Sequence, residues 1–368
     1  MKKKKIFIIG SYWAWNIWDE AILQVIKEKF WEKNINVIPA VPQLPFRFFS
    51  IPFRLKTFVN LWKSDLVLLW WWGLFTDSDS QKAIKIWWKN IFWAKLFWKK
   101  IFLFANSIWP FHEKKSFKMT KKYFEKIDYF SVRDKISFWE LEKMWFVKSS
   151  NKISKNEIGD EEKIIFSDPV FSFKISEKNN KSCSDSGPAV TTKKWNKKII
   201  AVSLRNLNKK NSWEFNFKEF EKFLDEKEKN WYQILFVAME DWDSILFEKY
   251  FTNRQQHALA CWQTKWRIIF KPKNFSELLE ILSDAEFCIW MRLHFLIASA
   301  ILWKKMLAIS YSQKVRWIME KIWINCLNLD EKNFVNCQQH ALACWNKKIL
   351  DEKKKFSELI NNVEKILK

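Results

Sequence analysis

Glycine is scarce in this chain. Only 4 of its 368 residues are glycine, whereas average usage near 7% would give about 26 in a chain of this length. Glycine enters left-handed backbone conformations freely, which makes it the usual residue of tight turns and helix ends. A chain of this size needs many such turns. The shortage therefore excludes turns built on glycine, unless another residue letter stands in its place.

Tryptophan occupies many of those places. The chain has 26 tryptophans, which recur in turn-like stretches such as "GSYWAWNIWDE" (10–20) and "WWWGLF" (70–75), and at helix ends such as "KLFWKK" (95–100). One interpretation is a tryptophan-rich core or aromatic binding surface. The other is that the host reads UGA codons as glycine, so that most tryptophan letters stand for glycine. The local contexts favour this second interpretation, because glycine is the residue that turns and helix ends select.

Long apolar runs and paired cysteines are also missing. No stretch reaches the roughly 20 uninterrupted apolar residues of a membrane span. The basic start "MKKKKIFIIG" is followed by no small-residue cleavage site of a signal peptide. The six cysteines show no C-x-x-C spacing, which argues against a disulfide framework. These absences predict a cytoplasmic protein, and peripheral association with the inner face of the membrane stays open.

The octamer "QQHALACW" occurs twice, at 255–262 and 338–345. Each copy places a histidine and a cysteine four residues apart, a spacing that on a helix suits a metal ion. The alternative is a genetic repeat inserted into two surface loops. Because the identical octamers lie in dissimilar surroundings, we favour the insertion and predict no metal site.

Positive charge dominates the composition. Lysine and arginine number 64 against 41 acidic residues, a net charge of +23. A stripe of such charge would indicate nucleic-acid binding, but the lysines are scattered along the chain. The pattern favours anionic small-molecule substrates and predicts no nucleic-acid partner. A non-enzymatic protein that binds polyanions remains an alternative.

Short apolar runs alternate with amphipathic helical stretches along the whole chain, a pattern typical of parallel α/β folds. We predict two doubly wound, Rossmann-like domains that face a cleft. The first spans 1–171, a polar linker spans 172–196 and the second domain spans 197–350. The helix at 351–368 is expected to pack back on the first domain. Ligands of such sheets lie at the carboxyl ends of the strands.

Several motifs in order along the chain carry a resemblance to a known family. They are two expected loops read with glycine, "GSYWAWNIWDE" (10–20) and "WWWGLFTDSDS" (70–80), and then "SIWPF" (107–111), "SVRDKIS" (131–137), "SDPVF" (167–171), "VSLR" (202–205), "WMRLHFLIASA" (290–300) and "ISYSQKV" (309–315). From about residue 6 to 323 the chain resembles the polysaccharide pyruvyl transferases, and M-R-L-H followed by Y-x-x-K-V is the most specific part. The chain departs from the family pattern where that pattern has glycine and the sequence has Trp13, Trp15, Trp18, Trp70, Trp71, Trp72, Trp109 and Trp290.

The resemblance implies a GT-B-like fold and a defined activity. Such an enzyme transfers the pyruvyl group of phosphoenolpyruvate onto two hydroxyls of a cell-surface polysaccharide sugar, forming a pyruvate ketal and releasing phosphate. The donor is a substrate, and no cofactor is expected. The acceptor partner is a glycan or a lipid-linked sugar. A GT-B glycosyltransferase that uses a sugar nucleotide, or an inactive copy disrupted by insertions, remains an alternative.

This chemistry points to particular residues. His294, Arg292 and Asp19 are the expected catalytic residues; the first two follow a strand and begin a helix, where an anion is favoured. Asp19 also fits an ordinary helix N-cap. Substrate binding is expected from cations that suit phosphate and carboxylate and from polar residues of the first-domain loops, namely Arg205, Lys314, Arg133, Asn16, Glu20, Gly73, Asp77 and Asp79. For Arg133, a structural bridge to a neighbouring acid such as Asp134 is the alternative.

Overall fold

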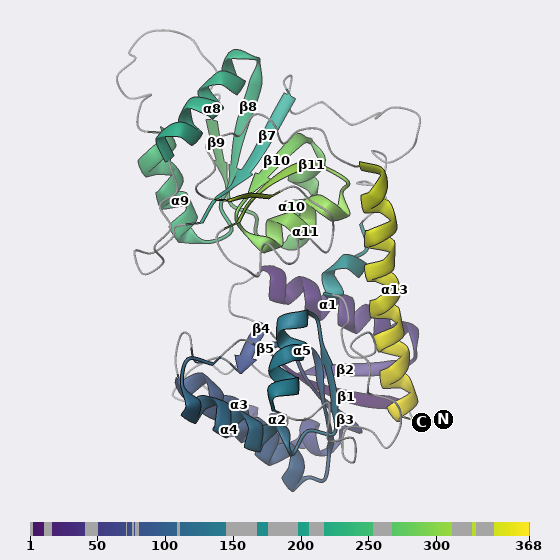
Figure 1. Ribbon diagram of the computed structural model, residues 1–368. Helices are drawn as coiled ribbons and strands as arrows, with labels where there is room; N and C mark the ends of the chain where they lie inside the picture. Colours follow the sequence, from purple (N-terminus) through teal and green to yellow (C-terminus); the bar gives the residue numbers. More distant parts are fainter. Residues whose placement is uncertain are drawn as a thin grey trace. The chain divides into compact units, whose positions relative to one another are not determined.

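The computed structural model describes residues 3–10, 17–40, 51–70, 72–75, 77, 81–108, 111–144, 168–175, 198–205, 217–252, 267–310, 326–328 and 342–367. The chain divides into two units (Figure 1). Unit 1 comprises Met1–Phe173 and Glu352–Lys368, and unit 2 comprises Lys174–Asp351. Of the expected linker, only residues 172–175 lie in the described part of the chain.

Unit 1 is built on a parallel sheet. Its strands are β1 (Lys4–Ile9), β2 (Ile35–Pro39), β3 (Leu66–Leu69), β4 (Trp72–Phe75), β5 (Lys100–Ile108) and β6 (Tyr129–Val132). β1 lies between β2 and β3, and β5 pairs with β3, β4 and β6. Most strand positions are apolar and buried, as expected for a sheet covered on both faces.

β4 differs from the expectation of a continuous loop over residues 70–80. Within that stretch Trp72 pairs with Ser107 and Phe75 pairs with Ile108. The end of β5 extends beyond its pairing with β3, so its backbone groups are available to a second short strand. The apolar half of the stretch therefore extends the sheet.

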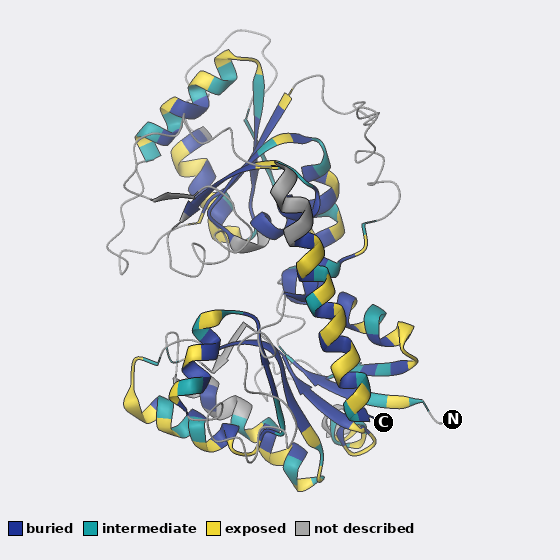
Figure 2. Ribbon diagram, turned by 45° about the vertical axis from the view of Figure 1, so that its right-hand side comes forward, coloured by how far each residue is buried: buried dark blue, intermediate teal, exposed yellow. Residues whose placement is uncertain are grey.

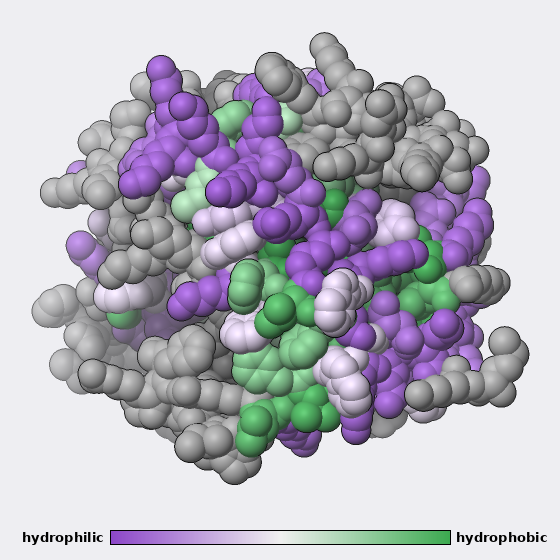
Figure 3. Space-filling model, turned by 90° about the horizontal axis from the view of Figure 1, so that it is seen from below, coloured by the Kyte–Doolittle hydropathy of each residue, from purple (hydrophilic) through white to green (hydrophobic). Residues whose placement is uncertain are grey.

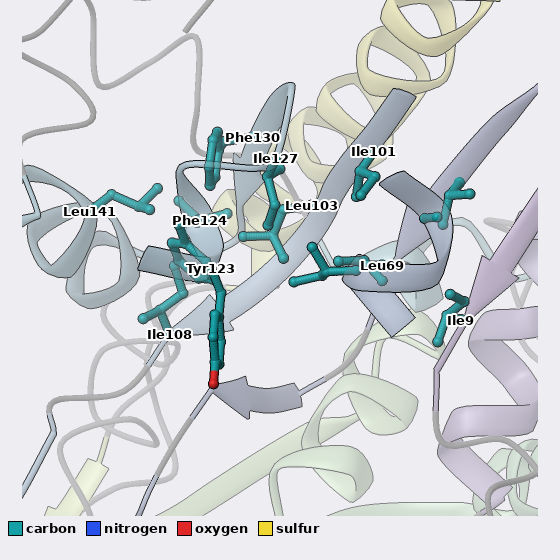
Figure 4. Packing of buried hydrophobic residues seen from close by; sticks show 14 of the residues in the cluster. Ile9, Leu69, Ile101, Leu103, Ile108, Tyr123, Phe124, Ile127, Phe130 and Leu141 are labelled. Carbon is teal, nitrogen blue, oxygen red and sulfur yellow. The ribbon is translucent and has the colours of Figure 1, made fainter. Parts of the chain in front are cut away.

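Helices cover both faces of this sheet: α1 (Ile17–Glu32), α2 (Ile51–Trp62), α3 (Gln81–Leu96), α4 (Lys114–Phe124) and α5 (Lys135–Lys143). Alternate strand residues point to opposite faces. Leu69 and Leu103 join a core cluster with Tyr123 and Phe124 of α4 (Figure 4). On the other face, Phe104 contacts Phe30 of α1 with ring centroids 6.3 Å apart.

The last helix, α13 (Leu342–Leu367), contributes its final residues to unit 1. The ring of Phe356 lies 6.1 Å from that of Phe104, edge-on. Glu364 forms a 3.4 Å ion pair with Lys33, just after α1. These contacts place α13 on the same face of the sheet as α1. Within the described residues, no helix has both the length and the apolar character needed to cross a bilayer.

Unit 2 contains a second parallel sheet, with strands β7 (Lys198–Ser203), β8 (Tyr232–Val237), β9 (Arg267–Phe270), β10 (Ala285–Trp290), β11 (Lys305–Ser310) and β12 (Cys326–Asn328). Its helices are α8 (Phe217–Lys229), α9 (Asp241–Phe247), the π-helix η2 (Glu248–Thr252), α10 (Phe275–Ser283) and α11 (Leu293–Ile301). Figure 2 shows buried positions on the sides of these helices that face the sheet and exposed ones outside. α8 buries Phe220, Phe223 and Leu224 in this way.

The strand order identifies the fold of each unit. In unit 2 it is β12-β11-β10-β7-β8-β9, so the first strand lies at the centre and the chain winds outward in both directions. In unit 1, β1 is likewise internal, with β2 on one side and β3 on the other. Both sheets are therefore doubly wound, and the prediction of two Rossmann-like domains is confirmed.

Three tryptophans end helices with a positive φ. Trp98 (φ 52°), Trp231 (φ 65°) and Trp303 (φ 58°) follow the ends of α3, α8 and α11. At two of them the hydrogen bonds complete a Schellman motif, from Lys99 N to Ala94 O (2.9 Å) and from Lys304 N to Ser299 O (3.0 Å). Glycine is the residue that this left-handed position favours, because it has no Cβ.

Candidate active site

The end of β10 and the end of β7 meet at the centre of the unit 2 sheet. The N–H of Met291 donates to the carbonyl of Ser203 at 2.8 Å. Connections leave these two strands in opposite directions, which is the switch point where doubly wound sheets bind ligands. Arg205 follows β7, and Arg292 follows β10 as the N-cap of α11. The fold thus brings two of the predicted residues to one edge of the sheet.

His294 is the second residue of α11, directly after this edge. The described part of the chain includes its backbone but not its side chain. Its place in the first turn follows from the strand order and from the start of α11 at Leu293. A histidine in the first turn of a helix lies close to free backbone N–H groups, which favour an anion beside it.

Arg292 is buried and paired with two carboxylates. Its Nη1 and Nη2 donate to Oε1 and Oε2 of Glu240 at 2.5 and 2.9 Å, and Nη2 also donates to Oδ1 of Asp243 at 2.6 Å. Glu240 follows β8 and Asp243 lies in the first turn of α9. Bidentate pairing of this kind fixes the plane of a guanidinium. The strand ends of β8 and β10 are thereby tied together through Arg292.

The two carboxylates differ in environment. Asp243 is fully buried, and its Oδ2 accepts the N–H groups of Met239 and Glu240, both at 3.1 Å. The side chain of Glu240 is 57% exposed. Asp243 is therefore held by the backbone as well as by Arg292. The more exposed Glu240 carboxylate pairs with Arg292 and also takes part in the capping box at the start of α9.

The pKa values show how these charges act on one another. Burial raises the pKa of Asp243, although the charge of Arg292 opposes this. Burial also acts to raise the pKa of Glu240, but the hydrogen bond and charge of Arg292 and the charge of Arg205 lower it overall. Burial would lower the pKa of Arg292, and its two acidic partners raise it. Arg205 therefore lies close enough to Glu240 for the two charges to interact.

Arg133 occupies the corresponding edge of unit 1, directly after β6. Its Nε donates to Oγ of Ser107 at 2.6 Å, and its Nη1 donates to Oδ2 of Asp168 at 2.9 Å. Asp134, the acid expected beside it, lies 3.9 Å from Nε. Burial lowers the pKa of Arg133 to about 10, against the charges of Asp168, Asp134 and Asp19. This arginine links β5, β6 and the segment before η1 (Pro169–Ser172).

The acids predicted in unit 1 lie in different settings. Asp19 is buried in the first turn of α1, where its charge acts on Arg133, whereas Glu20 is exposed. Asp77 accepts the N–H groups of His112 and Glu113 at 2.9 Å each, directly before α4. Burial acts to raise the pKa of Asp77, but these backbone hydrogen bonds lower it.

Several predicted positions are described only in part or not at all. Gly73 lies in the short strand β4. Asn16, Asp79 and Lys314 lie outside the described residues, as do the histidine and cysteine side chains of both QQHALACW repeats. Among the residues that the structure describes, no group of three or more His, Cys, Asp or Glu side chains could hold a metal ion.

Glu240, Asp243 and Asp168 were not predicted as site residues from the sequence. A signal for the first two is present, because "AMEDWDS" places an acid pair three residues apart directly after an apolar strand, as at a capped helix start. Asp168 belongs to "SDPVF", a segment assigned to the family pattern without a role. Neither pattern states which arginine the acids contact.

Comparisons with known proteins agree with this architecture. Two solved structures similar to the chain are the UDP-GlcNAc 2-epimerase of Methanocaldococcus jannaschii (TM-score 0.50, 12% identity, 95% of this chain and 99% of that one) and a Listeria monocytogenes protein named as a UDP-N-acetylglucosamine 2-epimerase (TM-score 0.51, 10% identity, 98% and 91%). At such identities the similarity concerns the fold alone. No curated protein matches the chain. The family model for polysaccharide pyruvyl transferase matches residues 5–151 and 154–313, and the chain belongs to that family.

Proposed function

We propose that this transferase moves the pyruvyl group of phosphoenolpyruvate onto two hydroxyls of one sugar in a cell-surface polysaccharide. The product is a cyclic pyruvate ketal, and phosphate is released. The observation that carries the proposal is the position of Arg292. Arg292 follows β10 at the switch point of unit 2, and Arg205 lies at the adjacent end of β7. The chain that carries both residues belongs to the polysaccharide pyruvyl transferase family.

The reaction balances with donor and acceptor alone. The methylene carbon C3 of the donor takes up a proton, and the first sugar hydroxyl adds to C2 and loses its own proton. The second hydroxyl then forms the other C–O bond at C2 as the bond to phosphate breaks. Its proton leaves with the phosphate. One group that gives a proton to C3 and takes one from the first hydroxyl serves both halves, and His294 is our candidate for it.

Arginine side chains suit a donor that carries both a phosphate and a carboxylate. In the structure, the end of the Arg292 guanidinium is covered by Glu240, and Asp243 holds Nη2 from a second direction. We assign the two acids different roles on the basis of exposure. Asp243 keeps Arg292 in place at all times. The half-exposed Glu240 covers Arg292 until an anionic group of the donor replaces its carboxylate.

The acceptor sugar is assigned to unit 1. Asn16, Glu20, Gly73, Asp77 and Asp79 belong to the segments that follow β1 and β3, the switch point of that sheet. Asp19 is a candidate for orienting a hydroxyl there. Arg133 is engaged by Ser107 and Asp168, which supports its structural role more than a contact with substrate. A lipid-linked acceptor and a cytoplasmic location form part of the same proposal.

Glycine at the tryptophan positions of the two loops is a further part of it. Support comes from Trp98, Trp231 and Trp303, which adopt the left-handed helix-end conformation that glycine favours. Trp290, in the family motif, is fully buried, and its indole N–H has no acceptor among the described residues. A buried donor without an acceptor is costly. Glycine from UGA codons would remove both the left-handed strain at the helix ends and the buried indole N–H of Trp290. It would also leave the two loops open to substrate.

The test is acceptor-dependent release of phosphate from phosphoenolpyruvate, with the ketal product identified by mass spectrometry. His294→Ala and Arg292→Ala should each lower kcat/KM by at least about 100-fold. Arg267→Ala is the matched control, because Arg267 is equally buried and paired with Glu228 at 2.9 Å but lies at the start of a strand. Release of a nucleotide from a sugar nucleotide instead would identify a glycosyltransferase. Equal activity of all three variants would refute the assigned residues.

A further inference from the structure

Apolar side chains are exposed on the outer sides of α2 and α3 in unit 1. Leu55 and Val59 of α2, and Phe92 and Leu96 of α3, are each between 43% and 58% exposed. Figure 3 views the molecule from the side of these helices and shows apolar side chains gathered in the middle of the face, bordered by hydrophilic ones. Contiguous exposed apolar patches are uncommon on soluble proteins and generally mark an interaction site.

These residues form one surface and not isolated positions. On α2, Leu55, Val59 and Trp62 follow an i, i+4, i+7 spacing, which places them in a single stripe. Phe58 of α2 contacts Trp93 of α3 edge-on, with ring centroids 4.9 Å apart. We call the exposed set the α2–α3 surface; it comprises Leu55, Val59, Trp62, Phe92, Trp93 and Leu96.

The charged residues within the sequences of α2 and α3 have one sign. α2 carries Arg54 and Lys56, α3 carries four lysines, and neither helix contains an aspartate or glutamate. Acids that flank these helices have partners of their own. Asp128 pairs with Lys95 at 2.5 Å, and Asp65 accepts the N–H of Lys5 at 2.7 Å.

We propose that the α2–α3 surface binds an anionic lipid bilayer, with the two helices lying along it. Helices that bind in the plane of a membrane combine aliphatic and aromatic residues on one side with lysine and arginine around them. Each basic residue near an anionic leaflet adds to the affinity. A second copy of this chain is a poor occupant, because two surfaces of the same positive charge repel each other.

The contact between Phe58 and Trp93 depends on a tryptophan position, but most of the α2–α3 surface does not. If Trp62 and Trp93 are glycine in the host, Leu55, Val59, Phe92 and Leu96 still form the exposed apolar set, and the lysines are unchanged. The surface consists of exposed helix side chains and contains none of the candidate acceptor residues. Its substitution should therefore leave activity on a soluble acceptor unaltered.

The experiment is co-sedimentation of the full chain with vesicles of phosphatidylcholine, with and without phosphatidylglycerol, in the absence of donor and acceptor. The test variant is Leu55→Gln with Leu96→Gln. The control is Ile245→Gln with Leu350→Gln, two positions of unit 2 with similar exposure. Removing two half-exposed leucines from the bilayer should lower partitioning into the anionic vesicles about 20-fold, and the control should bind as the unmodified chain does.

Three outcomes would overturn the proposal. The first is equal binding of both double variants to anionic vesicles, and the second is equal binding of the unmodified chain to vesicles with and without phosphatidylglycerol. The third is a change of oligomeric state in the test variant, seen by sedimentation velocity, without a change in vesicle binding. Far-UV circular dichroism of each variant establishes that it is folded. Because this experiment measures vesicle binding and not phosphate release, a negative result for membrane binding is distinct from a negative result for the proposed reaction.

Discussion

Replacing Trp98 or Trp231 by glycine should stabilise the folded chain. Both residues end a helix with a positive φ, where a side chain with a Cβ is strained against the following carbonyl. Both are also largely exposed, at 91% and 72%, so that their removal costs little packing. Replacing the largest side chain by glycine normally destabilises a protein. Stabilisation at these two positions would therefore point to the backbone conformation as its cause.

The magnitude follows from two opposing terms. A non-glycine residue in the left-handed region costs about 1–2 kcal/mol. Glycine also makes the unfolded chain more flexible, which reduces this gain in the free energy of unfolding by roughly 0.5–1 kcal/mol. The net gain in the free energy of unfolding is then about 0.5–1 kcal/mol at each position. Because Trp98 lies in unit 1 and Trp231 in unit 2, the two gains should add.

The assay is urea unfolding followed by circular dichroism, since the changes remove a fluorophore. Trp139→Gly is the matched control, because Trp139 is half exposed but lies inside α5 with helical backbone. Glycine in a helix interior should lower the free energy of unfolding by about 0.5 kcal/mol. The reasoning is refuted if Trp98→Gly and Trp139→Gly shift the unfolding midpoint in the same direction. Peptide mass spectrometry of the chain made in its own host then identifies the residue that stands at each position.

Two further predictions concern the buried arginines. Glu240→Gln should lower KM for phosphoenolpyruvate about fivefold and leave kcat unchanged, because the neutral amide competes less well for Arg292; steady-state phosphate release measures both constants, and a raised KM would show that Glu240 positions Arg292 instead. Asp168→Asn should lower the free energy of unfolding by about 2–3 kcal/mol, because Arg133 keeps a buried charge without its closest carboxylate. Glu286→Gln, at an exposed 3.6 Å pair with Lys198, should change it by less than about 0.5 kcal/mol in the same urea titration.

The fold was predictable because its signals are local. Strand segments such as "IFII" (6–9) and "LVLL" (66–69) are buried on both faces and therefore form unbroken apolar runs in the sequence. The strand β4 was not predictable in this way. Its letters "WGLF" (72–75) read as part of a glycine-like loop, and the stretch becomes a strand only because the end of β5 is left to pair with it.

The candidate site was predictable only in part, because its contacts are not local. The sequence places Arg133 beside Asp134, but the shorter contact is with Asp168, 35 residues further along the chain. Arg292 and Glu240 are 52 residues apart, and they meet because β8 and β10 lie on either side of β7. A motif marks the strand end at which a residue lies, whereas the strand order decides which other residues lie near it.

The two buried arginines, similar in sequence context, differ in what surrounds them. Both follow a strand, and each is held by at least one acid. The hydrogen-bonding partners of Arg133, Ser107 and Asp168, are themselves buried. An anion could reach that guanidinium only by opening the core of unit 1. Arg292 is held by buried Asp243 on one side and by half-exposed Glu240 on the other. In the proposed reaction, displacement of the Glu240 carboxylate would be enough to expose the Arg292 guanidinium to an anion. Exposure of the partner carboxylate, more than burial of the arginine, separates a structural ion pair from one that can open to a substrate.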